Sequence, residues 1–156
     1  MVTLLSQMAD YSQWVFLAYR LPREPSTPRI TIWRKLKRLG VAQVLDGLVA
    51  LPLDARNREQ LEWLADEMIQ SGGTASVWKA EPTTRRQERE LVAQMQSAVD
   101  HEYDNVIAQA DAGIESARTL KRLRAEIRRI ERRDYFPSGK KAKARAAVEA
   151  VARMVV

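Results

Sequence analysis

The sequence predicts an α+β protein in which a βαββαβ unit is followed by helices alone. Over residues 1–82, short apolar runs alternate with segments of helical period, in the order strand, helix, strand, strand, helix, strand. From Thr83 onward no strand-like run remains, and alanine, arginine and glutamate dominate. We therefore expect a ferredoxin-like domain over 1–82, with an antiparallel sheet and two helices on one face. A helical extension over 83–156 should pack on or beside it.

The first strand and helix form the opening of the predicted domain. The run Trp14–Tyr19 is rich in aromatic and β-branched residues, which is typical of a strand buried on both faces. Three prolines between residues 22 and 28 then hold the chain extended. Thr27 can cap a helix and Pro28 can occupy its first position, while Gly40 is placed to end it.

A hairpin and a second helix follow. Val41–Leu45 and Leu48–Leu51 flank Asp46-Gly47, a dipeptide typical of two-residue hairpin turns. Asp54 can cap the next helix. The apolar stripe of that helix comprises Leu61, Leu64, Ala65, Met68 and Ile69. After Gly72-Gly73, the segment Thr74–Ala80 predicts the last strand.

The extension over 83–156 predicts a small antiparallel helical subdomain. Apolar residues recur at helical spacing in two stretches, and Gly113 between them marks a break. The first stretch comprises Leu91, Met95, Val99, Val106, Ile107, Ala110 and Ile114, and the second Leu120, Leu123, Ile127 and Ile130. A last helix should start near Ser138, its cap, and run through Ala144, Val148, Val151 and Val155.

Four tryptophans, at positions 14, 33, 63 and 78, lie one on each of two predicted strands and two predicted helices. We interpret them as core aromatics, each on the apolar side of its element.

Composition restricts the chemistry. The chain has no cysteine, which excludes disulfides, thiolate zinc sites and redox thiols. Residues 1–10 are too short and interrupted for a signal peptide, and no apolar run approaches membrane-spanning length. We expect a cytoplasmic protein that has no cofactor and does not bind a membrane.

The net charge of +6 is unevenly distributed along the chain. Arg20–Arg38 carries seven basic residues against Glu24 alone, Glu81–Glu115 is acidic, and Arg118–Arg145 is basic again. Part of the last block can pair with the acidic segment across a helical hairpin, and part can bind phosphate. Such blocks indicate either polyanion binding or pairing within or between chains.

The first helix carries the strongest functional signal. Between Arg29 and Arg38 there are five basic residues and no acidic one, whereas a solvated helix face usually mixes both signs. This favours nucleic acid over a merely solubilising surface. The predicted contacts are Arg29, Arg34, Lys35, Lys37 and Arg38, with Arg20 and Arg23 from the preceding loop.

The segment 14–40, WVFLAYRLPREPSTPRITIWRKLKRLG, resembles the opening of the N-terminal domain of the chromate-resistance regulator family ChrB. Members carry a similar W-x-x-F/L-x-Y-x-L-P-x-E-P-S-x-P-R-x-x-x-W-R-x-L-K/R-x-L-G signature. Weaker likeness extends over essentially the whole chain, through Leu61–Leu64 and Arg133–Phe136. The resemblance implies a transcriptional regulator that binds double-stranded DNA and responds to chromate or another oxyanion. We expect such a regulator to act as a homodimer. Family members often carry a further C-terminal domain, whose ligand sensing we do not transfer to this chain.

Two alternatives of other classes remain open. The basic face and helical tail could instead form a non-enzymatic protein interaction module. A metal-dependent nuclease is the third reading, because some ferredoxin-like CRISPR spacer-acquisition proteins are nucleases with an aspartate at the end of the first strand. Here that strand ends Ala18-Tyr19-Arg20, and His101 with Asp104 is too small a set for a metal site. We therefore expect no catalytic or metal site.

Overall fold

The computed structural model describes residues 13–113 and 115–154. The predictions for residues 1–10, Ile114 and Val155 lie outside these ranges. The elements in chain order are β1 (Trp14–Arg20), α2 (Thr27–Leu39), β2 (Ala42–Leu45), β3 (Leu48–Pro52), α3 (Ala55–Gln70), β4 (Thr74–Ala80), α4 (Arg85–Asp111), α5 (Ala117–Arg132) and α6 (Lys140–Ala152).

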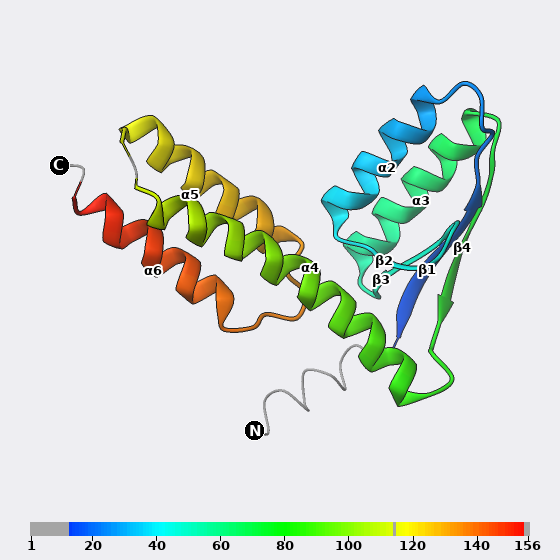
Figure 1. The fold of residues 1–156 in the computed structure, drawn as a ribbon. Coiled ribbons are helices and arrows are strands. Elements are labelled where there is room, and N and C mark those ends of the chain that lie inside the picture. Colours follow the sequence, from blue (N-terminus) through cyan, green and yellow to red (C-terminus); the bar gives the residue numbers. More distant parts are fainter. Residues whose placement is uncertain (1–12, 114, 155–156) are drawn as a thin grey trace. The chain divides into compact units, whose positions relative to one another are not determined.

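The four strands form one antiparallel sheet in the order β2-β3-β1-β4, which confirms the predicted βαββαβ arrangement. β1 is central because it pairs with β3 on one side (Leu17 opposite Val49) and with β4 on the other (Leu17 opposite Val77). Helices α2 and α3 lie side by side on one face of the sheet (Figure 1).

The core of this sheet domain includes residues of the inner strands β1 and β3 and one stripe of each helix. Because side chains alternate across a sheet, Val15 and Leu17 face the helices together with their cross-strand partners. The fully or nearly buried helical residues are Ile32, Leu36, Leu61, Leu64, Ala65 and Met68.

The interpretation of the tryptophans as core residues is correct only for Trp14, which is fully buried. Trp33, Trp63 and Trp78 are 42%, 59% and 60% exposed. Trp63 lies two residues after Leu61, about 200° away around α3 and thus opposite the core stripe. Trp78 points away from the helices, since on β4 its neighbour Val77 occupies the helix-facing side.

Two smaller predictions are also wrong. Ile69 is 52% exposed rather than part of the apolar stripe, because it lies at the edge of the buried face of α3. Strand β1 is buried on both faces only at its start, because Trp14 and Val15 are buried whereas Phe16 and Ala18, on the side away from α2 and α3, are half-buried.

Helix ends and turns follow local sequence signals in most places. Asp54 caps α3 by accepting a hydrogen bond of 2.7 Å from the Asn57 amide. Gly40 ends α2 in the left-handed region, as predicted. However, Thr27 is the first residue of α2 rather than its cap, and Ser26 at the cap position makes no side-chain capping bond.

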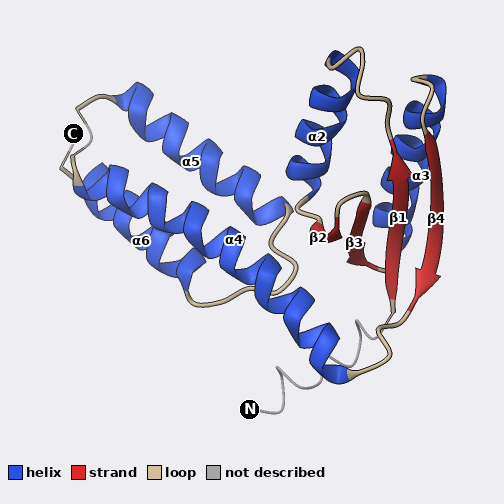
Figure 2. Cartoon of the chain, turned by 45° about the vertical axis from the view of Figure 1, so that its right-hand side comes forward, coloured by secondary structure: helices blue, strands red, loops and turns tan. Residues whose placement is uncertain are grey.

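The second half of α4 packs with α5 and α6 around a separate apolar core (Figure 2). That core consists of Val99, Tyr103, Val106, Ala110, Leu123, Ile127, Ile130, Ala144 and Val148. Ser116 caps α5 through the Thr119 amide, and the break between the two helices includes Gly113 at φ 102°. The predicted helical subdomain is therefore present.

The chain divides into two compact units, Met1–Leu91 and Val92–Val156, so α4 contributes to both. We call them the sheet unit and the helical unit. No helix within the described residues is long and apolar enough to cross a membrane.

Candidate nucleic-acid interface

Helix α2 carries three exposed cations on the side opposite its buried stripe. Ile32 and Leu36 face the core, and at about 100° per residue Arg34, Lys37 and Arg38 point outward. Within the described ranges, neither Arg34 nor Arg38 forms an ion pair or a side-chain hydrogen bond. Both guanidinium groups are therefore free to bind an anion.

Lys37 is partly oriented by its own helix. Its ammonium nitrogen lies 5.1 Å from the ring centroid of Trp33, a distance typical of a cation–π contact. The contact leaves the ammonium exposed, so it can still meet a phosphate. Lys37 and Arg38 also lie in the last turn of α2, where cations interact favourably with the helix dipole.

Lys35 differs from the other predicted contacts. Its ammonium lies 2.9 and 2.8 Å from the two carboxylate oxygens of Glu67 on α3. The geometry therefore directs Lys35 along the side of α2 toward the neighbouring helix and not outward with Arg34 and Arg38.

Arg20 and Arg29 line an open hollow in the sheet unit, with a volume of about 670 Å³. Its walls come from the end of β1, the first turns of α2 and the β2–β3 hairpin, which contributes Asp46. Tyr19 also lines it, and burial raises the pKa of the Tyr19 phenol. The nearby Asp46 carboxylate raises that pKa further and the Arg29 guanidinium lowers it, so charges of both signs reach the hollow.

The seven predicted site residues thus separate into groups. Arg34, Lys37 and Arg38 form the outward face of α2, and Arg20 and Arg29 line the hollow. Lys35 is bound to Glu67, and Arg23 is exposed in the loop before α2. The sequence did not predict the hollow, because three separate segments between Tyr19 and Gly47 build it and the way they pack cannot be read from their order.

The described residues contain no group of three or more His, Cys, Asp or Glu side chains that could hold a metal ion. His101 is exposed on α4. Asp104, one turn further on, binds Lys140 of α6 with a nitrogen–oxygen distance of 2.8 Å.

Comparison with known proteins identifies the family. The sequence profile described as "Protein ChrB, N-terminal" matches residues 29–112, which include α2 apart from its first two residues and the whole of α4. The chain is 26% identical over 138 residues to Protein ChrB of Cupriavidus metallidurans. That alignment covers 84% of this chain but only 43% of the relative, so the chain spans less than half of its length. No solved structure matches. The family match covers more than half of the sequence, and the chain belongs to the ChrB N-terminal family.

Proposed function

We propose that this protein is a cytoplasmic, DNA-binding transcriptional regulator connected with chromate resistance, and that α2 is its main contact with double-stranded DNA. The observation that carries the proposal is the outward face of α2, where Arg34, Lys37 and Arg38 lie together and no carboxylate neutralises them within the described residues. Membership of the ChrB N-terminal family supports it.

The physical basis is counterion release. Each phosphate that a Lys or Arg neutralises adds about 0.9 to the slope of log affinity against log salt. Three phosphate contacts from α2 would therefore contribute about 2.7 to this slope. Arg34 and Arg38 lie one turn apart on the same face, so they can also reach base edges, where arginine binds guanine through two hydrogen bonds.

The test is fluorescence anisotropy on duplex DNA from the gene's own upstream region, titrated across salt beside a scrambled duplex. We compare wild type with R34Q/K37Q/R38Q and with R56Q/K79Q/R89Q, which removes three exposed cations from three other elements of the sheet unit. We expect preference for the gene's own duplex and a loss of slope of about 2 to 3 only in the α2 variant. An equal loss of salt slope in both variants would mean that only the net charge of the protein matters, and it would overturn the role of α2.

We propose that the hollow is the binding site of the expected oxyanion effector. Arg20 and Arg29 supply two guanidinium groups beside the first turn of α2, which has no acidic residue. An anion bound there would alter the charge next to the DNA-binding face. Chromate should change DNA affinity of wild type, and R20Q/R29Q should not respond. An identical response in both proteins would exclude the hollow as the effector site.

A second candidate, a non-enzymatic interaction module, is favoured by the exposed tryptophans. Trp63 and Trp78 are more than half exposed, and tryptophan is enriched at protein interfaces. This function predicts an oligomer, a homodimer in the simplest case, that W63A or W78A dissociates without any effect of DNA. Light scattering after size-exclusion chromatography and DNA anisotropy together separate the two functions. The regulator loses DNA binding in R34Q/K37Q/R38Q and keeps its oligomeric mass, whereas the module binds no DNA even as wild type.

A further inference from the structure

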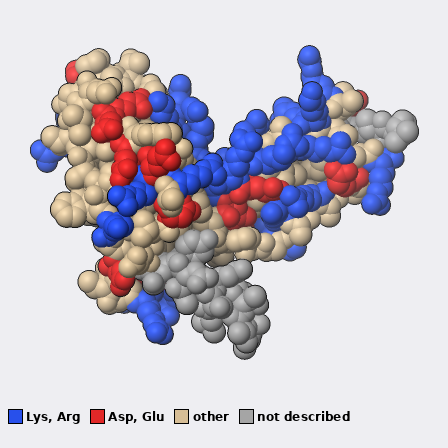
Figure 3. All heavy atoms as spheres, turned by 180° about the vertical axis from the view of Figure 1, so that it is seen from behind, with Lys and Arg blue, Asp and Glu red and all other residues tan. Residues whose placement is uncertain are grey.

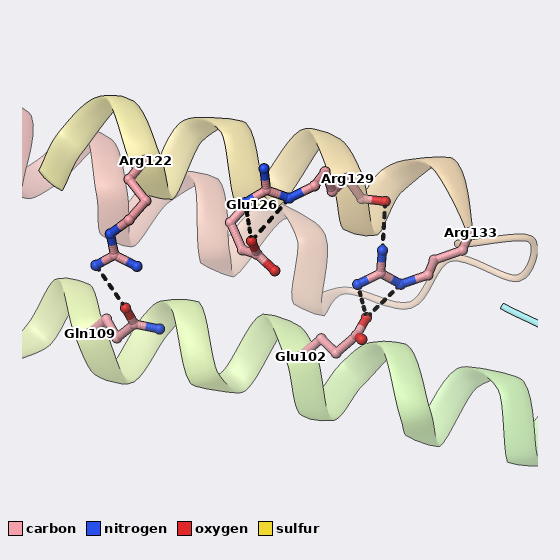
Figure 4. Close-up of polar contacts among 6 residues, drawn as sticks. All are labelled: Glu102, Gln109, Arg122, Glu126, Arg129 and Arg133. Atoms are coloured by element: carbon pink, nitrogen blue, oxygen red, sulfur yellow. Dashed lines mark hydrogen bonds and ion pairs between the residues drawn. The ribbon is translucent and has the colours of Figure 1, made fainter. Parts of the chain in front are cut away.

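Helix α5 and its C-cap residue Arg133 together carry eight basic residues, and the structure sorts them into two sets. Four of them have partners. Arg122 donates to the Gln109 side chain, Arg124 pairs with Glu149, Arg129 with Glu126, and Arg133 with Glu102. Three of these contacts are shown in Figure 4. These arginines connect α5 to α4 and α6 or bind within α5, so the helical unit uses them for its own structure.

The other four, Arg118, Lys121, Arg128 and Arg132, are exposed. None forms an ion pair or side-chain hydrogen bond with another residue in 13–113 or 115–154. At about 100° per residue the four fall within an arc of about 80° on α5. We call this set the α5 stripe.

The α5 stripe faces directly away from the core of the helical unit. Leu123, Ile127 and Ile130, the buried residues of α5, lie on the opposite side of the helix. The two glutamates of α5 lie on the flanks of the stripe, where Glu126 binds Arg129 and Glu131 binds Arg145. Figure 3 shows a band of Lys and Arg along the helical unit with carboxylates beside it.

The like charges of the α5 stripe repel one another and destabilise helix α5. Arg118 and Lys121 are like charges three residues apart, and Arg128 and Arg132 are four apart, spacings at which like charges destabilise a helix. A face that served only for solubility would gain from mixed signs at these positions. An external polyanion removes the repulsion by neutralising the side chains.

We propose that the α5 stripe binds the phosphodiester backbone of duplex DNA and is a second contact surface, independent of α2. Arg118 and Arg132 are 14 positions apart, so the stripe runs about 21 Å along the helix at about 1.5 Å per residue. A DNA strand presents a phosphate about every 3.4 Å, so the whole length of the stripe can meet phosphates. Exposed point charges without an orienting partner suit the sequence-independent part of binding. The inference rests on the proposed function in that the ligand is the same DNA.

The experiment uses the full chain and a scrambled duplex, so that only sequence-independent affinity is measured across salt. The stripe variant is R118Q/K121Q/R128Q/R132Q. Its matched control, R56Q/K79Q/R89Q/K143Q, removes the same charge from exposed positions on four different elements. A rescue variant, R118K/R128K/R132K, keeps the charge and changes the side-chain shape. Circular dichroism checks that each variant is folded.

We expect the stripe variant to lose about 2 to 4 units of salt slope, from up to four contacts of about 0.9 each. The scattered control should lose clearly less, and the lysine rescue should match wild type. If the stripe variant behaves like the scattered control while R34Q/K37Q/R38Q loses slope, the stripe proposal is overturned and the α2 proposal stands. The reverse pattern overturns the α2 proposal alone. If wild type binds no DNA, both fall. A stripe variant with normal DNA binding and a changed oligomeric mass would mean that the stripe binds another protein chain, which also overturns the proposal.

Discussion

The Lys35 ammonium lies between the two carboxylate oxygens of Glu67, at 2.9 and 2.8 Å, and this ion pair connects α2 to α3. Both side chains are part-exposed, at 42% and 36%, so solvent screens the interaction. The pair therefore assigns Lys35 to the packing of the two helices, while Arg34 next to it in sequence faces outward.

Lys35→Gln should change the stability of the protein, whereas Arg34→Gln should change its DNA binding. We expect Lys35→Gln to reduce the free energy of unfolding by up to about 1 kcal/mol, as for a screened ion pair, and to leave the salt slope of DNA binding unchanged. Arg34→Gln should leave stability unchanged and reduce the slope by about 0.9. Urea unfolding and anisotropy measure the two quantities. A slope loss in Lys35→Gln equal to that in Arg34→Gln would contradict the assignment.

Gly47 should not tolerate a side chain. Its φ is +79°, and a Cβ placed there would lie 2.5 Å from the Tyr19 carbonyl oxygen. Because the Tyr19 amide also donates to the Gly47 carbonyl at 2.8 Å, the two backbones cannot separate without losing that bond. We expect Gly47→Ala to cost more than about 2 kcal/mol.

Two other glycines provide controls for that measurement. Gly113 has φ +102° but no atom within 4 Å of a Cβ, so Gly113→Ala should cost only backbone strain, about 1 to 2 kcal/mol. Gly139 has φ −72° and equally open space, so Gly139→Ala should be nearly neutral. Equal unfolding midpoints for Gly47→Ala and Gly113→Ala would show that the close approach to Tyr19 does not matter.

Asp134 should make stability depend on pH in the acid range. Burial raises its pKa above the ordinary 3.8, against the lowering effects of the Tyr103 hydrogen bond and Lys141, with Asp100 and Glu131 adding to the increase. The folded chain therefore keeps this proton over a pH interval in which the unfolded chain has lost it. The contribution of Asp134 to the free energy of unfolding falls as pH rises from 3.8 through the raised pKa.

Asp134→Asn removes this titration and keeps an oxygen that can accept from Tyr103. The stability of the Asn variant relative to wild type should increase across the interval and then remain level. Urea titrations from about pH 4 to about pH 7 would measure this. A relative stability that falls with pH would contradict the raised pKa. As a control for the hydrogen bond of 3.1 Å, Tyr103→Phe should cost about 1 to 2 kcal/mol at neutral pH.

Solvent accessibility should distinguish the buried Trp14 from the other three tryptophans, which are exposed. Iodide should quench the fluorescence of Trp33, Trp63 and Trp78, which are exposed, and hardly that of Trp14. Variants that keep a single tryptophan, with phenylalanine at the other three positions, separate the signals. Quenching of Trp14 as strong as that of Trp63 would contradict its burial.

DNA binding adds a second readout to those variants. Under the proposed function, bound duplex should protect Trp33, which lies beside Lys37 on α2, more than Trp63 on α3. Equal protection of the two residues would argue against docking through α2.

Much of the fold was predictable because its signals are local. Asp46-Gly47 at the hairpin, Asp54 at the start of α3 and Gly40 at the end of α2 each act within a few residues, and the structure confirms all three. The order of apolar runs was enough to predict the βαββαβ topology. The prediction that all four tryptophans are buried was wrong because residue type alone does not determine burial. Trp63 lies opposite the core stripe of α3, and Trp78 lies on the outer side of β4.

For the functional surfaces, the sequence determined less and the tertiary structure decided more. Residue order alone determined that α2 is basic and amphipathic, because helical periodicity places Ile32 and Leu36 opposite Arg34 and Arg38 whatever surrounds the helix. Only the tertiary structure decided which cations are free. Glu67 binds Lys35 from 32 positions away in sequence. Glu149 of α6 binds Arg124 of α5, and Glu102 of α4 binds Arg133 at the C-cap of α5. Ion pairing depends on distances of a few ångströms between side chains on different elements, and these distances exist only once the elements have packed.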